Sequence, residues 1–465
     1  MKSKNFIKKA EYPGGGDALK KFVKKTLRYP KEALLHRVEG SVYLKYEVNE
    51  KGKVHSISVV NGLGYGCDEE AIRIISLLKY SQVKNRGLKV NTKFKLAIHF
   101  KLPPAIPIKK GDKVAFSMRN YPEWINIYIA VTSIGAIAVP LNSWWQGEEL
   151  EYGVTHSESK IFIGDGERLD RLEGLLKETP RISVRCDASK FMNTVAFEDV
   201  VTLKDSFPDA EIHPEDDASI MYTSGSTGYP KGVVATHRSV VSAPETWALL
   251  GQLAGQIEVD GVAGSSMPAP ENPCTLAAVP LFHVTGSHAV FLLSLVTARK
   301  IVFMYKWDAK TALSLIEKHK VTDMTGVPTM AWEVLEAHKE HPEIDISSLK
   351  GLGSGGAARP PEQLKSQERE HPDKVATVGY GLTETNAHGT NASGPILYER
   401  PSTAGFPIPP ITQIKIVGED GREVATNEVG EVAIKSTCNF RCYLKNQDAT
   451  NEVLDSEGWF RSGDV

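Results

Sequence analysis

The residues best suited to chemistry lie in one short segment, residues 222–233, which reads Tyr-Thr-Ser-Gly-Ser-Thr-Gly-Tyr-Pro-Lys-Gly-Val. Because glycine lacks a Cβ, Gly225 and Gly228 allow the backbone to turn its N–H groups toward an anion. Further hydrogen-bond donors and one positive charge come from Thr223, Ser224, Ser226, Thr227 and Lys231. These residue types at this spacing predict a loop that binds phosphate groups.

The commonest phosphate loop, Gly-x-x-x-x-Gly-Lys-Ser/Thr, does not fit this segment. Pro230 stands where its last glycine should be, and Gly232 stands where its hydroxyl residue should be. Apolar runs over residues 218–222 and 232–235 flank the loop, which predicts a strand-loop-strand unit. Taken alone, the segment also fits a flexible Gly/Ser linker.

Four further segments follow the loop in order: Pro280-Leu-Phe-His283, Gly353-Ser-Gly-Gly-Ala357, Gly379-Tyr-Gly-Leu-Thr-Glu-Thr385 and Gly458-Trp-Phe-Arg-Ser-Gly-Asp464. With the loop, they resemble the adenylate-forming (AMP-binding) superfamily of acyl-CoA synthetases, luciferases and peptide-synthetase adenylation domains. The resemblance covers about residues 108–465. It implies a layered α/β domain that activates a carboxylic acid, fatty or otherwise apolar, to an acyl-adenylate, with ATP, Mg²⁺ and coenzyme A.

The resemblance also implies a role for each segment. Lys231 and residues 223–228 would hold the leaving pyrophosphate. Thr383 would contact the α-phosphate and Glu384 would bind Mg²⁺, a hard cation that prefers carboxylate oxygen. His283 would orient the incoming carboxylate. The adenosine part of ATP would contact Gly355, Gly356, Ala357, Tyr380, Gly381 and Asp464.

In that last group, Tyr380 would stack on the adenine and Asp464 would accept hydrogen bonds from both ribose hydroxyls. Without the resemblance, the Thr383-Glu384 pair also fits a helix cap. A lone histidine such as His283 also fits a hydrogen-bonded core residue.

Two parts that are typical of the superfamily have no counterpart in the segments quoted above. Relatives begin their large domain well before the segment that starts at Ile108, and they carry a mobile small domain with a second lysine after the ribose aspartate. We therefore expect impaired turnover. Two alternatives stay open: a non-catalytic binding protein, and an artificial fusion of two unrelated pieces.

The charge distribution divides the chain into two parts. The net charge is −2, but 22 basic and 9 acidic residues precede residue 105, which leaves 33 basic and 48 acidic residues behind it. The lysines of the basic part are scattered rather than grouped with aromatic residues, which favours a solvated face over nucleic-acid binding.

The five cysteines are few and widely spaced, which is typical of a reducing compartment. The first residues of the sequence are basic but contain no apolar run of the length found in a signal peptide. We expect a cytoplasmic protein with no transmembrane segment; residues 124–141 carry no charge but fit a buried helix followed by a buried strand.

The basic front part predicts a small α+β unit. Alternating apolar residues predict strands over 40–48 and 54–60 in a hairpin, followed by a helix capped by Asp68 and a strand over 90–102. On that helix, Ala71, Ile72, Ile75 and Leu78 share one face. Residues 12–102 contain, in order, Tyr29-Pro30, Gly40-Ser-Val42, the turn Asn49-Glu-Lys-Gly52 and Cys67-Asp-Glu-Glu-Ala-Ile-Arg73. With the closing strand, this order resembles the carboxy-terminal domain of TonB-type energy transducers, which implies a periplasmic setting and a protein partner that adds to an exposed strand edge.

Strands and helices alternate through the remaining chain. Strands are expected over 299–304, 321–327, 349–354 and 374–379, with helices after Asp308 and Pro328. After these elements, short strands expected over 414–417 and 428–435 replace the alternation of strands and helices. We therefore predict a TonB-like domain over 1–104 with a proline-rich seam at 102–107, an AMP-binding α/β domain over 105–410, and a β subdomain of the same region over 411–465.

Overall fold

The computed structural model describes residues 9–30, 32–33, 36, 38–83, 90–101, 107–201, 206, 208–223, 228–253, 256, 258–259, 262–263, 270–408 and 410–465. These residues form two compact units. Unit 1 comprises residues 1–107 and 185–206, and unit 2 comprises residues 108–184 and 207–465. Most of the expected seam, residues 102–106, lies outside the described residues.

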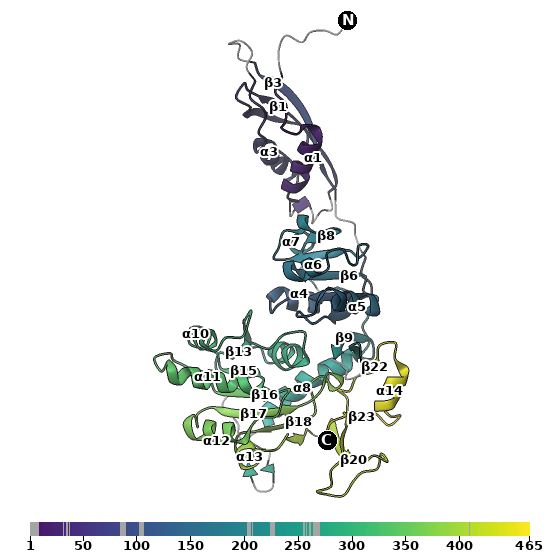
Figure 1. Cartoon of the computed structure of the whole chain (residues 1–465), viewed down its shortest axis with the longest axis vertical. Coiled ribbons are helices and arrows are strands. Elements are labelled where there is room, and N and C mark those ends of the chain that lie inside the picture. Colours follow the sequence, from purple (N-terminus) through teal and green to yellow (C-terminus); the bar gives the residue numbers. More distant parts are fainter. Residues whose placement is uncertain are drawn as a thin grey trace. The chain divides into compact units, whose positions relative to one another are not determined.

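Unit 1 contains a three-stranded antiparallel sheet in the order β2-β1-β3, accompanied by the helices α1 and α3 (Figure 1). The elements are α1 Gly15–Thr26, β1 Gly40–Val48, β2 Val54–Asn61, α3 Cys67–Ser76 and β3 Thr92–Phe100. The inward residues of β1 alternate along the strand because successive side chains point to opposite faces. The segment 185–206 adds η1 Ala188–Lys190, β8 Thr194–Ala196 and α7 Phe197–Val200.

Two expectations for the α3 helix are wrong. Gly66, with φ +83°, is its N-cap, while the Asp68 carboxylate accepts hydrogen bonds from the backbone N–H groups of Leu63 and Gly64. The aspartate therefore closes the preceding turn instead of capping the helix. Ile72 is 38% exposed, and Ile74 occupies the core in its place.

Unit 2 begins with a mostly parallel sheet. Its strands in this unit follow the order β22-β10-β9-β5-β4-β6-β7. The elements are β4 Lys113–Ser117, α4 Pro122–Thr132, β5 Ile137–Pro140, α5 Gly147–Ser157, β6 Ile161–Asp165, α6 Gly166–Arg171, β7 Arg181–Val184, β9 Asp217–Thr223, β10 Lys231–Thr236, α8 His237–Leu253 and β22 Cys442–Tyr443. The buried helix and strand expected within residues 124–141 are confirmed as α4 and β5.

The second sheet of unit 2 has seven strands in the order β14-β13-β15-β16-β17-β18-β19 and is parallel from β14 to β17. Its elements are β13 Cys274–Ala277, η3 Thr285–Leu292, α9 Leu293–Val296, β14 Lys300–Phe303, α10 Ala309–His319, β15 Asp323–Gly326, α11 Pro328–Glu340, β16 Gly351–Gly355, α12 Pro361–Glu370, β17 Val375–Tyr380, η4 Thr383–Thr385, β18 Thr390–Ser393, α13 Gly394–Glu399 and β19 Phe406–Pro407. Asp308 caps α10 as expected, accepting a 2.7 Å hydrogen bond from the Thr311 N–H.

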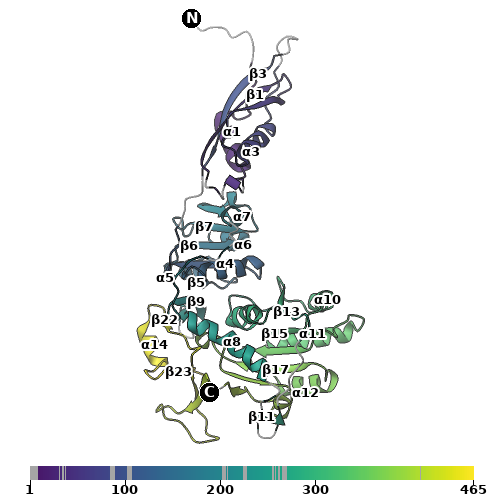
Figure 2. The same ribbon diagram turned by 180° about the vertical axis from the view of Figure 1, so that it is seen from behind.

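A short β11-β12 pair (Glu258–Val259, Val262–Ala263) and a three-stranded antiparallel sheet in the order β20-β21-β23 complete unit 2. The latter comprises β20 Thr412–Val417, β21 Glu431–Ser436 and β23 Trp459–Arg461, and α14 spans Gln447–Val453. Both views place α14 beside β22 and β23 (Figures 1 and 2). Layered α/β sheets with a small β subdomain confirm the expected fold class. No helix in the described ranges is long and apolar enough to cross a membrane.

Candidate functional site

The phosphate-loop segment joins two antiparallel strands, as the sequence predicts. Strand β9 ends at Thr223 and β10 begins at Lys231, and these two residues are cross-strand partners. Thr223 and Lys231 therefore mark the two stems of the loop and lie opposite each other. Gly228 lies on the second stem with φ +148°. The remaining loop residues, Ser224, Gly225, Ser226 and Thr227, lie outside the described residues.

Lys231 and Glu384 converge on Tyr443. The Lys231 Nζ lies 4.8 Å from the centroid of the Tyr443 ring, and the Tyr443 hydroxyl donates a 2.7 Å hydrogen bond to Oε1 of Glu384. Tyr443 reaches this position because β22 pairs with β10, with Val233 opposite Tyr443. Segments distant in the chain therefore place one cation and one carboxylate on the same aromatic side chain.

The β22 strand is held against the hairpin by polar contacts. Arg441 donates two hydrogen bonds of 2.7 and 2.8 Å to the carboxylate of Asp217, the first residue of β9. The Leu444 N–H donates a 2.7 Å bond to the Gly232 carbonyl on β10. A two-pronged arginine-carboxylate contact fixes orientation as well as distance. The position of Tyr443 is thus set by its neighbours on both sides.

Glu384 is a buried acid, with 8% of its surface exposed. Burial raises its carboxyl pKa above the usual value, because an apolar environment disfavours the charged form. The Tyr443 hydrogen bond and the positive charge of Lys231 act in the opposite direction, and the charge of Asp464 adds to the increase. A bound cation would stabilise the ionised carboxylate further.

The backbone after Glu384 has an unusual conformation. Asn386 and Ala387 have φ values of +52° and +62°, a region that residues with a Cβ rarely occupy. The Asn386 amide donates a buried 2.7 Å hydrogen bond to the Cys438 carbonyl, which offsets part of the cost. Such strain is common where a chain segment is held for function. Nothing in the local sequence pointed to Asn386 or to Tyr443.

Some of the residues expected to contact adenosine are neighbours in the structure. The Tyr380 hydroxyl donates a 2.8 Å hydrogen bond to Oδ2 of Asp464. Gly355 ends β16 beside Gly379 of β17, and a Cβ on Gly355 would lie 3.0 Å from the Gly379 carbonyl oxygen. The carboxyl ends of these adjacent parallel strands are where ligands bind in open α/β sheets.

The other three residues expected to contact adenosine differ in backbone conformation, exposure and packing. Gly356 has φ +75°, which favours glycine, and Ala357 is exposed on the segment after β16. Gly381 is packed against the main chain, and an added Cβ would lie 2.4 Å from the carbonyl carbon of Ala387. Gly381 therefore serves the packing of the Thr383-Glu384 turn, where Thr383 begins η4.

His283 follows β13 and has an exposed side chain. Its ring lies 4.5 Å from that of Phe282 and 6.5 Å from that of Trp144. Partial desolvation lowers the pKa of the imidazole. In the described part of unit 2, no hydrogen bond or ion pair joins His283 to Lys231 or Glu384, so its contact with the reacting carboxylate stays a prediction.

Asn120 fixes the chain segment that carries His283. Its amide nitrogen donates hydrogen bonds of 3.2 and 2.9 Å to the carbonyls of Ala277 and Val279, and its oxygen accepts a 3.0 Å bond from the Leu281 N–H. Asn120 follows β4 in the first sheet, and β13 belongs to the second. One buried side chain therefore connects the two sheets at the base of the His283 turn.

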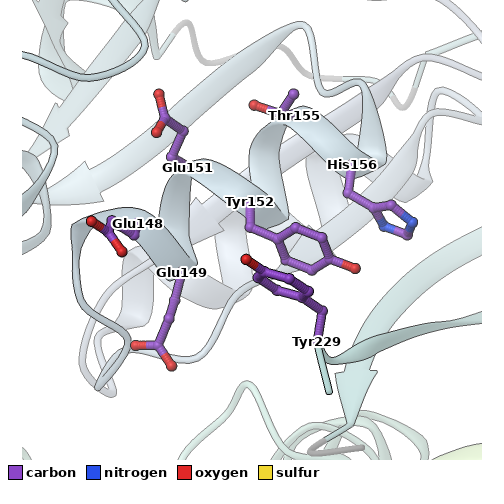
Figure 3. Close-up of a pocket in the computed structure, with 7 residues that line it drawn as sticks. All are labelled: Glu148, Glu149, Glu151, Tyr152, Thr155, His156 and Tyr229. Atoms are coloured by element: carbon purple, nitrogen blue, oxygen red, sulfur yellow. The ribbon is translucent and has the colours of Figure 1, made fainter. Parts of the chain in front are cut away.

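A pocket of about 690 Å³ lies beside α5, near the second stem of the loop (Figure 3). Its lining includes Glu148, Glu149 and Glu151, along with the rings of Tyr152 and Tyr229. Three carboxylates disfavour a polyanion through like-charge repulsion. We therefore place no phosphate in this pocket.

The donor set around Glu384 fits a magnesium-phosphate ligand better than a metal held by protein alone. The described residues contain no group of three or more His, Cys, Asp and Glu side chains that could hold a metal ion. Mg²⁺ is often bound by one or two carboxylates together with substrate phosphates. Glu384 could supply such a carboxylate, and the ammonium group of Lys231 lies over the ring of the same Tyr443.

Comparisons of sequence and structure identify proteins that are similar to this chain. The chain is similar to 4-coumarate--CoA ligase 3 of Arabidopsis thaliana, with 28% identity over 77% of this chain and 62% of that protein. It is 30% identical to a feruloyl-CoA synthase of Amycolatopsis over 78% of this chain and 67% of that protein. The inhibitor-bound N-terminal domain of FACL13 from Mycobacterium tuberculosis matches with a TM-score of 0.64 and 28% identity, over 77% of this chain and 83% of that domain.

The family descriptions divide the chain near the expected seam. Residues 25–102 match the Gram-negative bacterial TonB protein C-terminal family, which confirms the resemblance of the front part. Residues 103–444 match the AMP-binding enzyme family. The chain spans about 62% of the length of the plant ligase. Because this match covers most of the chain, the protein belongs to the AMP-binding enzyme family.

Proposed function

We propose that unit 2 activates a carboxylic acid with ATP, as AMP-forming acyl-CoA ligases do. A carboxylate oxygen attacks the α-phosphorus of ATP, the bond from that phosphorus to the bridging oxygen of the β-phosphate breaks, and pyrophosphate leaves. The product is an acyl-adenylate, and the thiol of coenzyme A is the proposed acceptor of the acyl group. The observation that carries this proposal is the convergence of Lys231 and Glu384 on Tyr443.

Each residue has a proposed part in that reaction. Negative charge builds on the phosphates as pyrophosphate leaves, and preorganised positive groups stabilise it. Lys231 and Thr223 would face the leaving pyrophosphate, together with residues 224–228. Mg²⁺, when bound to Glu384, would neutralise phosphate charge. Thr383 would contact the α-phosphate.

The nucleoside and the acid would be held by separate groups. Gly355, Gly356 and Ala357 would lie against the adenine, which would stack on Tyr380. Asp464 would accept hydrogen bonds from the ribose hydroxyls, and the hydrogen bond between Tyr380 and Asp464 supports a shared role for these two residues. His283 would orient the carboxylate. We further propose an acid with an apolar chain or ring, because Phe282 and Trp144 lie beside His283.

ATP-pyrophosphate exchange tests the proposal. The full chain should exchange label between pyrophosphate and ATP with at least one acid in a panel of fatty and aromatic carboxylic acids. Lys231→Ala and Glu384→Ala should abolish exchange. The matched control is Lys339→Ala, because Lys339 lies 5.6 Å from the ring of Trp332 in a similar contact on the α11 surface. Exchange that survives both site substitutions would remove both residues from the mechanism.

We also propose a reducing compartment such as the cytoplasm, because the five cysteines are few and widely spaced and no disulfide joins two of them among the described residues. Thiol labelling of the native protein, with and without prior reduction, checks this. Equal labelling in the two samples is expected.

A second candidate function belongs to unit 1. In its described sheet, β2 and β3 each pair with β1 on one side, which leaves an open edge on each. We propose that an extended peptide adds a strand to one of these edges. Hydrogen exchange of the full chain with a panel of extended peptides would show slowed amides in β2 or β3. Unchanged exchange in both strands with every peptide would exclude this role for that panel.

A further inference from the structure

Both stems of the phosphate loop contact one face of α5. Before the loop, the Tyr222 hydroxyl lies 2.9 Å from Nδ1 of His156. After the loop, the Tyr152 hydroxyl donates a 3.0 Å hydrogen bond to the Pro230 carbonyl oxygen. Tyr152 and His156 are four residues apart on the helix, so they are neighbours on its surface.

Stacked rings extend these contacts to Tyr229. Its ring centroid lies 4.9 Å from that of Tyr152 at an interplanar angle of 28°, and Tyr152 stacks in turn on His156 at 5.0 Å and 16°. Figure 3 shows the rings of Tyr152 and Tyr229 facing each other beside the helix. Tyr229 is 78% exposed, so this stacking is its main anchor in the structure.

The helix that provides this face is capped at its start and contacts the segment after β22 at its end. At its start, the Gln146 N–H donates a 2.7 Å hydrogen bond to the Glu149 carboxylate. At its end, Glu158 forms a surface ion pair of 2.8 Å with Lys445, two residues after Tyr443. The helix α5 thus contacts both the hairpin and the segment that carries Tyr443.

We propose that α5 is a clamp for the loop stems, with Tyr152 as its main positioning residue. Tyr152 holds the Tyr229–Pro230 stem, and this sets where the next residue, Lys231, begins β10 opposite Thr223. This inference rests on the proposed function. If Lys231 contacts the β- and γ-phosphates, loss of the clamp should weaken the binding of ATP, which has these phosphates. It should not weaken the binding of AMP, which lacks them.

Calorimetric titration of the full chain with ATP·Mg²⁺ and, separately, with AMP tests the clamp. Tyr152→Phe removes one hydrogen bond and should weaken ATP·Mg²⁺ by about three- to tenfold, the net value of such a bond, with AMP affinity unchanged. Tyr229→Ala removes the ring stack and should weaken ATP·Mg²⁺ by a similar factor. Tyr229→Phe keeps the stack and should retain the original affinity for both nucleotides.

The control variant is Thr155→Ala, because Thr155 is exposed on the same helix and points away from the rings in Figure 3. It should leave both affinities unchanged. Equal ATP·Mg²⁺ affinity in all variants would overturn the clamp, and so would parallel weakening of ATP and AMP. Binding of neither nucleotide by the unaltered chain would overturn the clamp and the proposed function together.

Discussion

The Tyr443 hydroxyl donates a 2.7 Å hydrogen bond to Oε1 of Glu384 and lies on the aromatic ring that Lys231 contacts at 4.8 Å. This bond reaches a buried acid, since Glu384 is 8% exposed. It stabilises the ionised form, while burial disfavours it. The pair therefore connects the charge state of the proposed magnesium ligand to a residue outside the phosphate loop.

Tyr443→Phe should raise the Glu384 pKa further, because it removes a donor to the ionised carboxylate. Leaving a buried acceptor without its donor costs about 1–3 kcal/mol. We expect the acidic limb of the pyrophosphate-exchange pH profile to move to higher pH, with recovery of the rate in more alkaline buffer. A profile that is lowered equally at every pH would contradict this role of Tyr443.

Protons and Mg²⁺ should compete for Glu384. Its pKa is raised in the folded protein, so the acid holds its proton at a higher pH than an exposed carboxyl group does. The Mg²⁺ concentration that gives half-maximal exchange should therefore increase as the pH falls toward the raised pKa. Chelation of the metal should stop exchange reversibly. A Mg²⁺ requirement that is independent of pH on the acidic side would exclude Glu384 as the ligand.

Asn120→Ala should destabilise unit 2 by about 2–4 kcal/mol, because it leaves buried groups of Ala277, Val279 and Leu281 without their partner. All seven tryptophans lie in unit 2, so their fluorescence during urea unfolding reports this unit alone. Asn126→Ala, at an exposed position of the partly buried helix α4, is the control and should change stability by less than about 0.5 kcal/mol. Equal midpoints for the two variants would show that Asn120 does not connect the sheets energetically.

His288 and His388 should make unit 2 sensitive to acid. Burial lowers both pKa values from 6.5 to about 4. A base with a lower pKa in the folded state binds fewer protons there than in the unfolded state, so stability is complete above the unfolded pKa and falls as the pH decreases toward about 4. Each shift corresponds to at most about 3 kcal/mol.

Urea midpoints from tryptophan fluorescence at neutral pH and at about pH 5 measure this loss, since the lower value lies between the folded and unfolded pKa values. His388→Gln should reduce the difference between the two midpoints, and the exposed-surface variant His213→Gln should leave it unchanged. A difference that persists in full after both His288→Gln and His388→Gln would contradict burial of neutral imidazoles as its cause.

Helices and strands could be predicted from the sequence where the residues that determine them lie close together in the chain. Alternation over residues 40–48 predicted β1, and Asp308 before an apolar face predicted α10 with its cap. The same reasoning failed at Asp68, where two backbone N–H groups of the preceding turn competed successfully with the helix for one carboxylate. Short polar side chains offer both options, and packing decides between them.

Site residues could be predicted where they belong to a segment with a distinctive composition. They could not be predicted where their position depends on the pairing of strands that are far apart in the chain. The apolar runs on both sides of the glycine-hydroxyl-lysine segment predicted two strands joined by a loop, and these strands are β9 and β10. Tyr443 gave no signal, because its place beside Glu384 follows from the pairing of β22 with β10. Asn386 was equally silent, since its buried hydrogen bond is made to the carbonyl of Cys438, which is distant in the chain.

The most direct test of the central claim is the anomalous diffraction signal of Mn²⁺ in crystals of the full chain grown with Mn²⁺ and ATP. We predict one Mn²⁺ peak at coordination distance from the Glu384 carboxylate, with the outer phosphates of the same ATP against Lys231. A nucleotide-bound Mn²⁺ located away from Glu384, or phosphates that do not meet Lys231, would contradict the account.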